Sequence, residues 1–197
     1  CVLKGGKTLS IFVFSSVKAI SQYTVEEILE MGIDGFWIGY EGTRSNYAKQ
    51  QGRPIEEILT EFREHGITIL TSMIVGFDYQ TPAVVAQEFD GLMKLKPALG
   101  QYLIYGPPPG TPFYERVMRE NLMHEKYVQD PVLMYRRADG FTTIMKHPTL
   151  SPAEIEGLQQ WCFEQDFQRL GPSIFRVLES RFLGYQKLKN SPNPRLR

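Results

Sequence analysis

The sequence predicts an α/β fold: a partial parallel (β/α) barrel followed by a helical C-terminal extension. The apolar, β-branched run between Gly66 and Gly76 is typical of a strand buried on both faces, as strands of parallel sheets are. Predicted strands begin at Ile33, Ile67 and Gln101, which are 34 residues apart. Each interval holds one strand and one helix, which indicates parallel strands joined by right-handed crossovers.

The composition is that of an ordinary folded chain. Its 197 residues suit one domain, or one domain with an appendage. The 22 Lys and Arg residues balance the 22 Asp and Glu residues, so net charge gives no attraction to nucleic acid, and no nucleic-acid partner is expected. No long uncharged apolar run occurs, so neither a transmembrane helix nor a signal peptide is expected.

The ends of the sequence suggest a fragment. A (β/α) barrel normally needs about 250 residues, and only about four strand–helix units are present. The chain starts at Cys1 and its first methionine is Met31. We therefore expect the upstream part of the same protein to be a partner of this chain. Cys1 and Cys162 provide no disulfide framework and no metal-ligand spacing, so a cytoplasmic location is expected.

Helix starts are marked by strong local signals. A capping box spans residues 24–27, where Glu follows Thr by three places. Thr81 precedes Pro82, and Thr111 precedes Pro112, so each threonine can cap a helix that its proline opens. The predicted strands are 9–14, 33–40, 66–76 and 101–105, and the predicted helices start near residues 24, 54, 82 and 112.

The pattern changes after residue 120. Residues 1–120 form the predicted barrel half, and residues 121–197 form an irregular segment followed by the helical extension. Residues 121–150 show no periodicity. A second capping box at 151–154 starts a helix that Gly171 and Pro172 end. The next helix carries an apolar stripe: Ile174, Val177, Leu178, Phe182, Tyr185 and Leu188.

Candidate site residues follow from the carboxyl ends of the parallel strands, where α/β folds bind ligands. They are Ser15, Ser16, Glu41, Ser72, Ile74, Gly76, Tyr105 and Pro108. Structural roles stay open for some: Glu41 as a salt-bridge carboxylate, Gly76 as a turn residue, and Ser72 bonded to backbone. No catalytic residue is assigned. His65, His124 and His147 lack metal-ligand spacing, and structural or solvated roles are expected for them.

Three segments together resemble one enzyme family. FWIGYEG at 36–42, the 66–76 strand and GPPPGTP at 106–112 recur in this order in radical SAM enzymes. The chain is most similar to members that also carry an N-terminal cobalamin-binding domain. Residues 146–148 and 171–185 onward are similar to the C-terminal extension of that group, so the resemblance covers nearly the whole chain.

The resemblance implies four strand–helix units of a radical SAM (β/α)₆ barrel, namely strands three to six. Such enzymes hold a 4Fe–4S cluster through a Cys-x₃-Cys-x₂-Cys loop after the first strand. The cluster reductively cleaves S-adenosylmethionine, and the resulting 5′-deoxyadenosyl radical removes a substrate hydrogen. The loop is absent, so the cluster ligands lie outside this chain, which alone is expected to be inactive. The subgroup often carries out methylation or other C–H functionalisation, and the resemblance leaves cobalamin use open.

The resemblance also assigns positions around S-adenosylmethionine. Ile74 and Gly76 match the Ile and second Gly of the family's Gly-x-Ile-x-Gly-x-x-Glu element, which packs on adenine. Ser72 stands in place of its first Gly, and Tyr79 in place of its Glu. The resemblance places Ser15, Ser16 and Glu41 near the ribose and methionine groups. The turn that holds Pro108 would frame the adenine or the substrate.

Two other functions remain open. One is part of a phosphate-binding (β/α) barrel enzyme, although Pro112 removes an amide donor from the turn that would bind phosphate. The other is a non-enzymatic α/β interaction module with a helical arm. For the main hypothesis, the further partner is a small-molecule or lipid-like substrate that the sequence does not identify.

Overall fold

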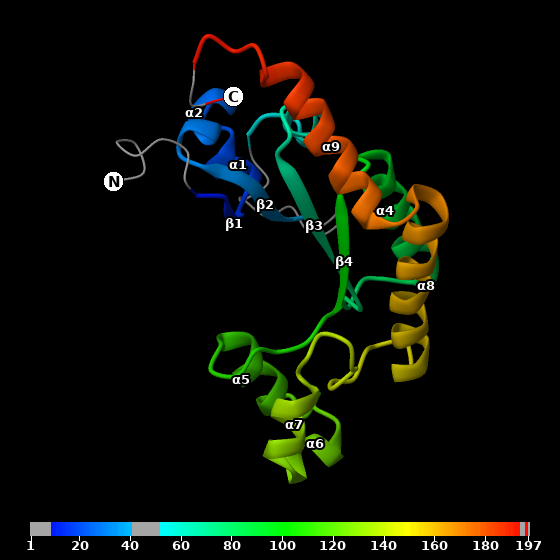
Figure 1. Cartoon of the computed structure of the whole chain (residues 1–197). Helices are drawn as coiled ribbons and strands as arrows, with labels where there is room; N and C mark the ends of the chain where they lie inside the picture. Colours follow the sequence, from blue (N-terminus) through cyan, green and yellow to red (C-terminus); the bar gives the residue numbers. More distant parts are fainter. Residues whose placement is uncertain (1–8, 41–51, 194–195, 197) are drawn as a thin grey trace. The chain divides into compact units, whose positions relative to one another are not determined.

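The computed structural model describes residues 9–40, 52–193 and 196 (Figure 1). The strands are β1 (Ile11–Ser15), β2 (Ile33–Gly39), β3 (Thr68–Val75) and β4 (Leu99–Ile104). The helices are α1 (Val17–Ile20), α2 (Val25–Glu30), α3 (Ile55–Glu64), α4 (Pro82–Lys94), α5 (Pro112–Arg119), α6 (Glu125–Gln129), α7 (Pro131–Arg137), α8 (Pro152–Leu170) and α9 (Ser173–Leu188).

The four strands form one parallel sheet in chain order, β1-β2-β3-β4 (Figure 1). Phe14 of β1 is in register with Trp37 of β2, and Trp37 is in register with Leu70 of β3. Since each strand neighbours the one before it, every crossover turns in the same direction. The prediction of an α/β fold with parallel strands is confirmed.

The predicted helix starts are present with their hydrogen bonds. Thr24 Oγ1 accepts from the amide of Glu27, and Glu27 Oε2 accepts from the amide of Thr24, at 3.2 and 2.8 Å. The second capping box pairs Ser151 with Glu154 in the same way. Thr111 Oγ1 accepts from the amide of Tyr114 at 3.2 Å, which starts α5. These signals act within one turn, so the sequence alone is enough to place them.

The segment predicted to be irregular, 121–150, is partly helical. It contains α6 and α7, which have five and seven residues. Asp130 Oδ1 caps α7 by accepting from the amide of Leu133 at 2.9 Å, with Pro131 at the first helical position. Helices of one or two turns are too short to show an apolar period, and the Asp-Pro start signal was not used in the prediction.

The chain divides into two compact units. The first unit comprises residues 1–72, 90–101 and 166–197, and the second comprises 73–89 and 102–165. Ile28, Ile38 and Phe62 are buried in the first unit, and Phe89 and Tyr102 in the second. Each unit therefore buries apolar side chains of its own.

Within the first unit, α9 turns its small residues inward. A Cβ atom on Gly184 would lie 2.5 Å from the Cα atom of Gly66. Ser180 Oγ donates to the carbonyl of Arg63 at 3.2 Å, and Arg181 pairs with Asp34 at 3.1 Å. Most of the predicted apolar stripe is instead exposed, with Ile174, Leu178, Phe182 and Tyr185 at 55–65%. Close backbone approach decides which face of α9 is buried.

We predict that Gly184→Ala destabilises the chain. Because the new methyl group would meet backbone rather than a flexible side chain, the free energy of unfolding should fall by about 1–3 kcal/mol. Gly157→Ala is the matched control, since a Cβ atom there meets nothing within 4 Å. That variant should be neutral or slightly more stable. Urea denaturation followed by tryptophan fluorescence measures both, and equal midpoints would contradict the prediction.

Candidate functional site

Gln80 fixes the loop that follows β3. Its side chain is buried, at 1% exposure. Oε1 accepts from the amides of Gly76 and Phe77 at 2.7 and 3.0 Å, and Nε2 donates to the carbonyl of Ile74 at 3.1 Å. The loop therefore hydrogen-bonds to a side chain where the ladder of strand hydrogen bonds ends.

Glu88, on α4, holds Gln80 in place. It is 2% exposed. Its Oε2 accepts from Gln80 Nε2 at 2.7 Å, and its Oε1 accepts from the Tyr79 hydroxyl at 3.2 Å. The Gln80–Glu88 pair is thus a buried network in which both carboxylate oxygens of Glu88 and the side-chain amide of Gln80 form hydrogen bonds. Such networks specify one geometry because an unmet buried partner is costly.

A cavity of 430 Å³ lies at the carboxyl ends of β3 and β4, within the second unit. Three residues predicted for the site line it: Ile74, Tyr105 and Pro108. Leu103, Phe113 and Ile144 complete most of its apolar wall. The size falls within the usual range for small-molecule pockets. The structure thus brings Ile74, at the end of β3, together with Tyr105 and Pro108, which follow β4, whereas Gly76 is not in the lining.

Stacked aromatic rings support one side of this cavity. Tyr105 lies between Phe77 and Phe113, with ring centroids 4.6 and 4.7 Å away. Tyr79 stacks on Phe77, with ring centroids 5.6 Å apart. The guanidinium of Arg116 lies 5.2 Å from the Phe113 centroid. The row joins the loops after β3 and β4 to α5, so these elements are held together by large apolar contacts.

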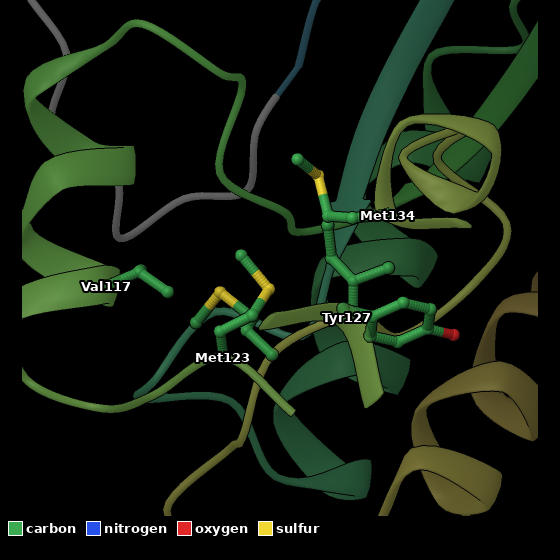
Figure 2. Close-up of a cluster of buried hydrophobic side chains, with 6 residues drawn as sticks. Val117, Met123, Tyr127 and Met134 are labelled. Carbon is green, nitrogen blue, oxygen red and sulfur yellow. The ribbon is translucent and has the colours of Figure 1, made fainter. Parts of the chain in front are cut away.

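A buried apolar cluster, which Figure 2 shows, also packs against the cavity wall. Ile144 belongs to both the cavity lining and this cluster. The other buried members are Val117, Met123, Tyr127, Met134 and Met145. Lys146 and His124 extend the packing by backbone bonds, as the His124 amide donates to the carbonyl of Ile144 at 3.1 Å. The short helices α6 and α7 therefore position one side of the cavity.

Gly76 adopts a backbone conformation that favours glycine, with φ of 97°. A Cβ atom there would lie 3.2 Å from Ile155 of α8 and 3.9 Å from Tyr105. Ile155 is itself buried. The glycine thus lets α8 pack close to the loop after β3. Its role beside adenine stays a prediction.

Ser15, Ser16 and Ser72 lie in the first unit. Ser16 caps α1 by accepting from the amide of Ala19 at 3.2 Å. Ser15 lines a separate apolar cavity of 180 Å³. The Ser72 backbone carbonyl accepts from the amide of Tyr40 at 2.8 Å. Glu41 lies outside the described residues. The structure therefore shows a helix cap for Ser16 and a backbone bond for Ser72, and the ligand roles of all these residues stay predictions.

His147 ties the loop after β3 to the segment before α8. Its Nδ1 accepts from the amides of Thr149 and Leu150 at 3.1 and 2.9 Å. The proton of the neutral ring therefore lies on Nε2, which donates to the carbonyl of Phe77 at 3.0 Å. Gln80, Glu88 and His147 were not predicted to shape the site. The partner of His147, Phe77, lies 70 residues away. The partners of Gln80 and Glu88 are closer in sequence, but no local pattern marks these residues as buried.

His124 is held as a neutral ring. Burial, and then the charges of Lys126 and Lys146, lower the pKa of His124 below its usual value. Its Nε2 is buried without a hydrogen-bond partner in the part of the chain that the structure describes. Protonation would place an unpaired charge there, so the folded state disfavours it.

The described residues offer no metal centre. Among residues 9–40, 52–193 and 196, no three His, Cys, Asp or Glu side chains gather as a metal site. Cys162 is fully buried on α8, and burial raises the pKa of its thiol to about 12. A thiol that stays protonated is a poor metal ligand.

Comparison with family models and with curated proteins identified no match for this chain. In the described part of the chain, every helix is too short or too polar to cross a bilayer.

We predict that Gln80→Glu disrupts the loop after β3 and that adding Glu88→Gln restores it in part. The single change keeps the acceptor for Gly76 and Phe77 but places two carboxylates side by side. The free energy of unfolding should fall by about 2–3 kcal/mol. The double variant exchanges donor and acceptor between positions 80 and 88, so part of the loss should return, while the Ile74 carbonyl still lacks its donor. Urea denaturation of all four proteins tests this; additive losses in the double variant would refute the network.

We predict that acid weakens the fold through His124. Its pKa is lowered on folding, so its contribution is complete above the unfolded value of about 6.5 and is lost as the pH falls. The unfolded chain binds more protons in this window, and stability rises with pH. His124→Asn should flatten the profile between pH 7 and 5. Unfolding midpoints at several pH values provide the measurement, and parallel profiles for both proteins would contradict it.

Proposed function

We propose that this chain is the C-terminal half of the catalytic domain of a radical SAM enzyme. In that role it forms the adenine side of the S-adenosylmethionine site and part of the substrate cavity. The observation that carries the proposal is that Ile74, Tyr105 and Pro108, selected on sequence, line one cavity. That cavity lies at the carboxyl ends of parallel strands, where α/β folds bind ligands.

The sheet supports a partial (β/α)₆ barrel. Strands in chain order suit a barrel, whereas a doubly wound sheet needs a reversal of strand order. Phe12 and Phe14 of β1 are 47% and 76% exposed on one face of the sheet. In a barrel that face points to the interior, where side chains of the other strands would cover it. The upstream part of the protein would supply those strands.

Several residues fit a bound S-adenosylmethionine. Ile74 presents an apolar side chain to the cavity, which suits the flat face of adenine. The Gln80–Glu88 pair holds the loop after β3 in a fixed position beside it. In radical SAM enzymes the bound S-adenosylmethionine is the source of the radical that removes a hydrogen atom from an unreactive C–H bond. Cobalamin-dependent members use this chemistry for methylation. The residues of this chain would bind and orient it.

The described residues do not fit a 4Fe–4S cluster. Iron–sulfur clusters are held by several cysteine thiolates. Cys162 is the one cysteine among the described residues, and its buried thiol has a raised pKa. The proposal therefore assigns the cluster ligands to the upstream part of the protein.

One observation favours the interaction module as a second candidate. Phe175, Leu178, Phe182 and Tyr185 form an exposed apolar stripe along α9. Exposed apolar patches often mark protein interfaces. In that case Leu178→Asp would abolish association while leaving ligand binding at the cavity unchanged.

The test of the main proposal is anaerobic reconstitution of two proteins. This chain alone should retain no cluster and release no 5′-deoxyadenosine. The protein extended upstream of Cys1 should hold about four irons and cleave S-adenosylmethionine. A cluster on the isolated chain, or no iron on the extended protein, would overturn the proposal.

A variant pair localises the binding within the extended protein. Ile74→Ala should weaken S-adenosylmethionine binding by about tenfold, because buried methylene contacts are lost. Ile174→Ala is the matched control, since Ile174 is 60% exposed on α9. Isothermal titration calorimetry measures the affinity of both variants for S-adenosylmethionine. Equal affinities would show that Ile74 does not contact the bound molecule.

A further inference from the structure

The side chains around the 430 Å³ cavity carry no formal charge. Its described lining contains no Asp, Glu, Lys, Arg or His residue. Ile74, Leu103, Phe113 and Ile144 dominate the wall. Thr142 and Tyr105 add hydroxyls, and Thr142 Oγ1 donates to Asp139 Oδ2 at 3.4 Å. The side chains therefore offer mainly dispersion and hydrophobic contact.

Three backbone carbonyls of the wall already accept hydrogen bonds within the protein. The Gly140 carbonyl accepts from the Ile104 amide at 2.7 Å and from Gln159 Nε2 at 2.8 Å. The Ile74 carbonyl accepts from Gln80 Nε2 at 3.1 Å. The Pro108 carbonyl accepts from Thr111 Oγ1 at 2.7 Å. A ligand thus gains little hydrogen bonding from these groups.

The charged groups near the cavity lie outside its lining. Arg116 lies 3.8 Å from Asp78 and over the ring of Phe113, and its buried Nε has no hydrogen-bond partner among the described residues. Asp139 accepts from the amide of Phe141 at 2.8 Å. A charged ligand group in this cavity would lose its hydration and find no counter-charge on the wall. An uncharged apolar group loses no such hydration and is favoured by burial.

We propose that this cavity, beside the adenine contact with Ile74, binds an uncharged, hydrocarbon-rich part of the substrate, so that the substrate is lipid-like. Phosphate and carboxylate groups, including the carboxylate of S-adenosylmethionine, are thereby excluded from contact with this wall. That the bound molecule is the substrate rests on the proposed function. The chemical preference of the cavity rests on its lining alone.

Isothermal titration calorimetry of the 197-residue chain tests this preference, with 1-octanol, octanoate and octyl phosphate as probes. The three share one alkyl chain and differ in charge. We expect saturable binding of octanol, with octanoate and octyl phosphate at least about tenfold weaker. Absence of octanol binding, or equal or tighter binding of a charged probe, would overturn the proposal.

Two Ala→Leu variants locate the site. Ala138 and Ala153 are both exposed, but Ala138 lines the cavity and Ala153, at the start of α8, does not. Ala138→Leu fills part of the cavity and should weaken octanol binding roughly tenfold or more. Ala153→Leu should bind as the parent chain does. Equal affinities in the two variants would overturn the proposed location.

Thr142→Val keeps the shape of the wall and removes the Thr142 hydroxyl, while the Tyr105 hydroxyl remains. We expect unchanged octanol affinity, and a tenfold loss would show that hydrogen bonding, not apolar contact, governs recognition. Circular dichroism confirms that each variant is folded. These titrations contain neither iron nor S-adenosylmethionine. Octanol binding without S-adenosylmethionine cleavage in the extended protein would therefore defeat the proposed function alone, and the reverse result would defeat this inference alone.

Discussion

Parallel pairing of each strand with the strand before it is the constraint on which the rest of the structure depends. It brings the carboxyl ends of neighbouring strands to one edge of the sheet. The loops after β3 and β4 therefore lie together, and Ile74 and Tyr105 can line one cavity although they are far apart in sequence. The candidate site is thus a direct consequence of strand order.

Side chains then fix what strand order alone leaves loose. The Gln80–Glu88 pair holds the loop after β3, and the buried cluster around Met123 and Met134 holds the wall that carries Ile144 (Figure 2). Both supports are buried, so changing one residue in either of them lowers the stability of the fold. Together they give the cavity a defined shape, as preorganised binding sites require.

Local signals in the sequence predicted the four strands and the capped starts of α2, α4, α5 and α8 correctly, because a cap involves residues within one turn, but the capped starts of α1 and α7 were missed. The buried roles of Gln80 and Glu88 could not be predicted, since neither residue type indicates burial. The stripe on α9 indicated an apolar face, yet the close approach of Gly184 to Gly66 turns that stripe to the surface. The sequence pattern therefore could not predict which face of α9 is buried, because that depends on the close approach of two backbones. Of the predicted site residues, Ile74, Tyr105 and Pro108 share a cavity, while the roles of Ser15, Ser16 and Glu41 stay predictions.

The central claim is that this chain completes a barrel whose other strands lie upstream. A crystal structure of the protein extended upstream of Cys1, with S-adenosylmethionine bound, tests it most directly. The account predicts a parallel strand paired with the free edge of β1, residues covering Phe14, and adenine in contact with Ile74. An upstream region that leaves β1 unpaired, or adenine bound away from the ends of β3 and β4, would contradict it.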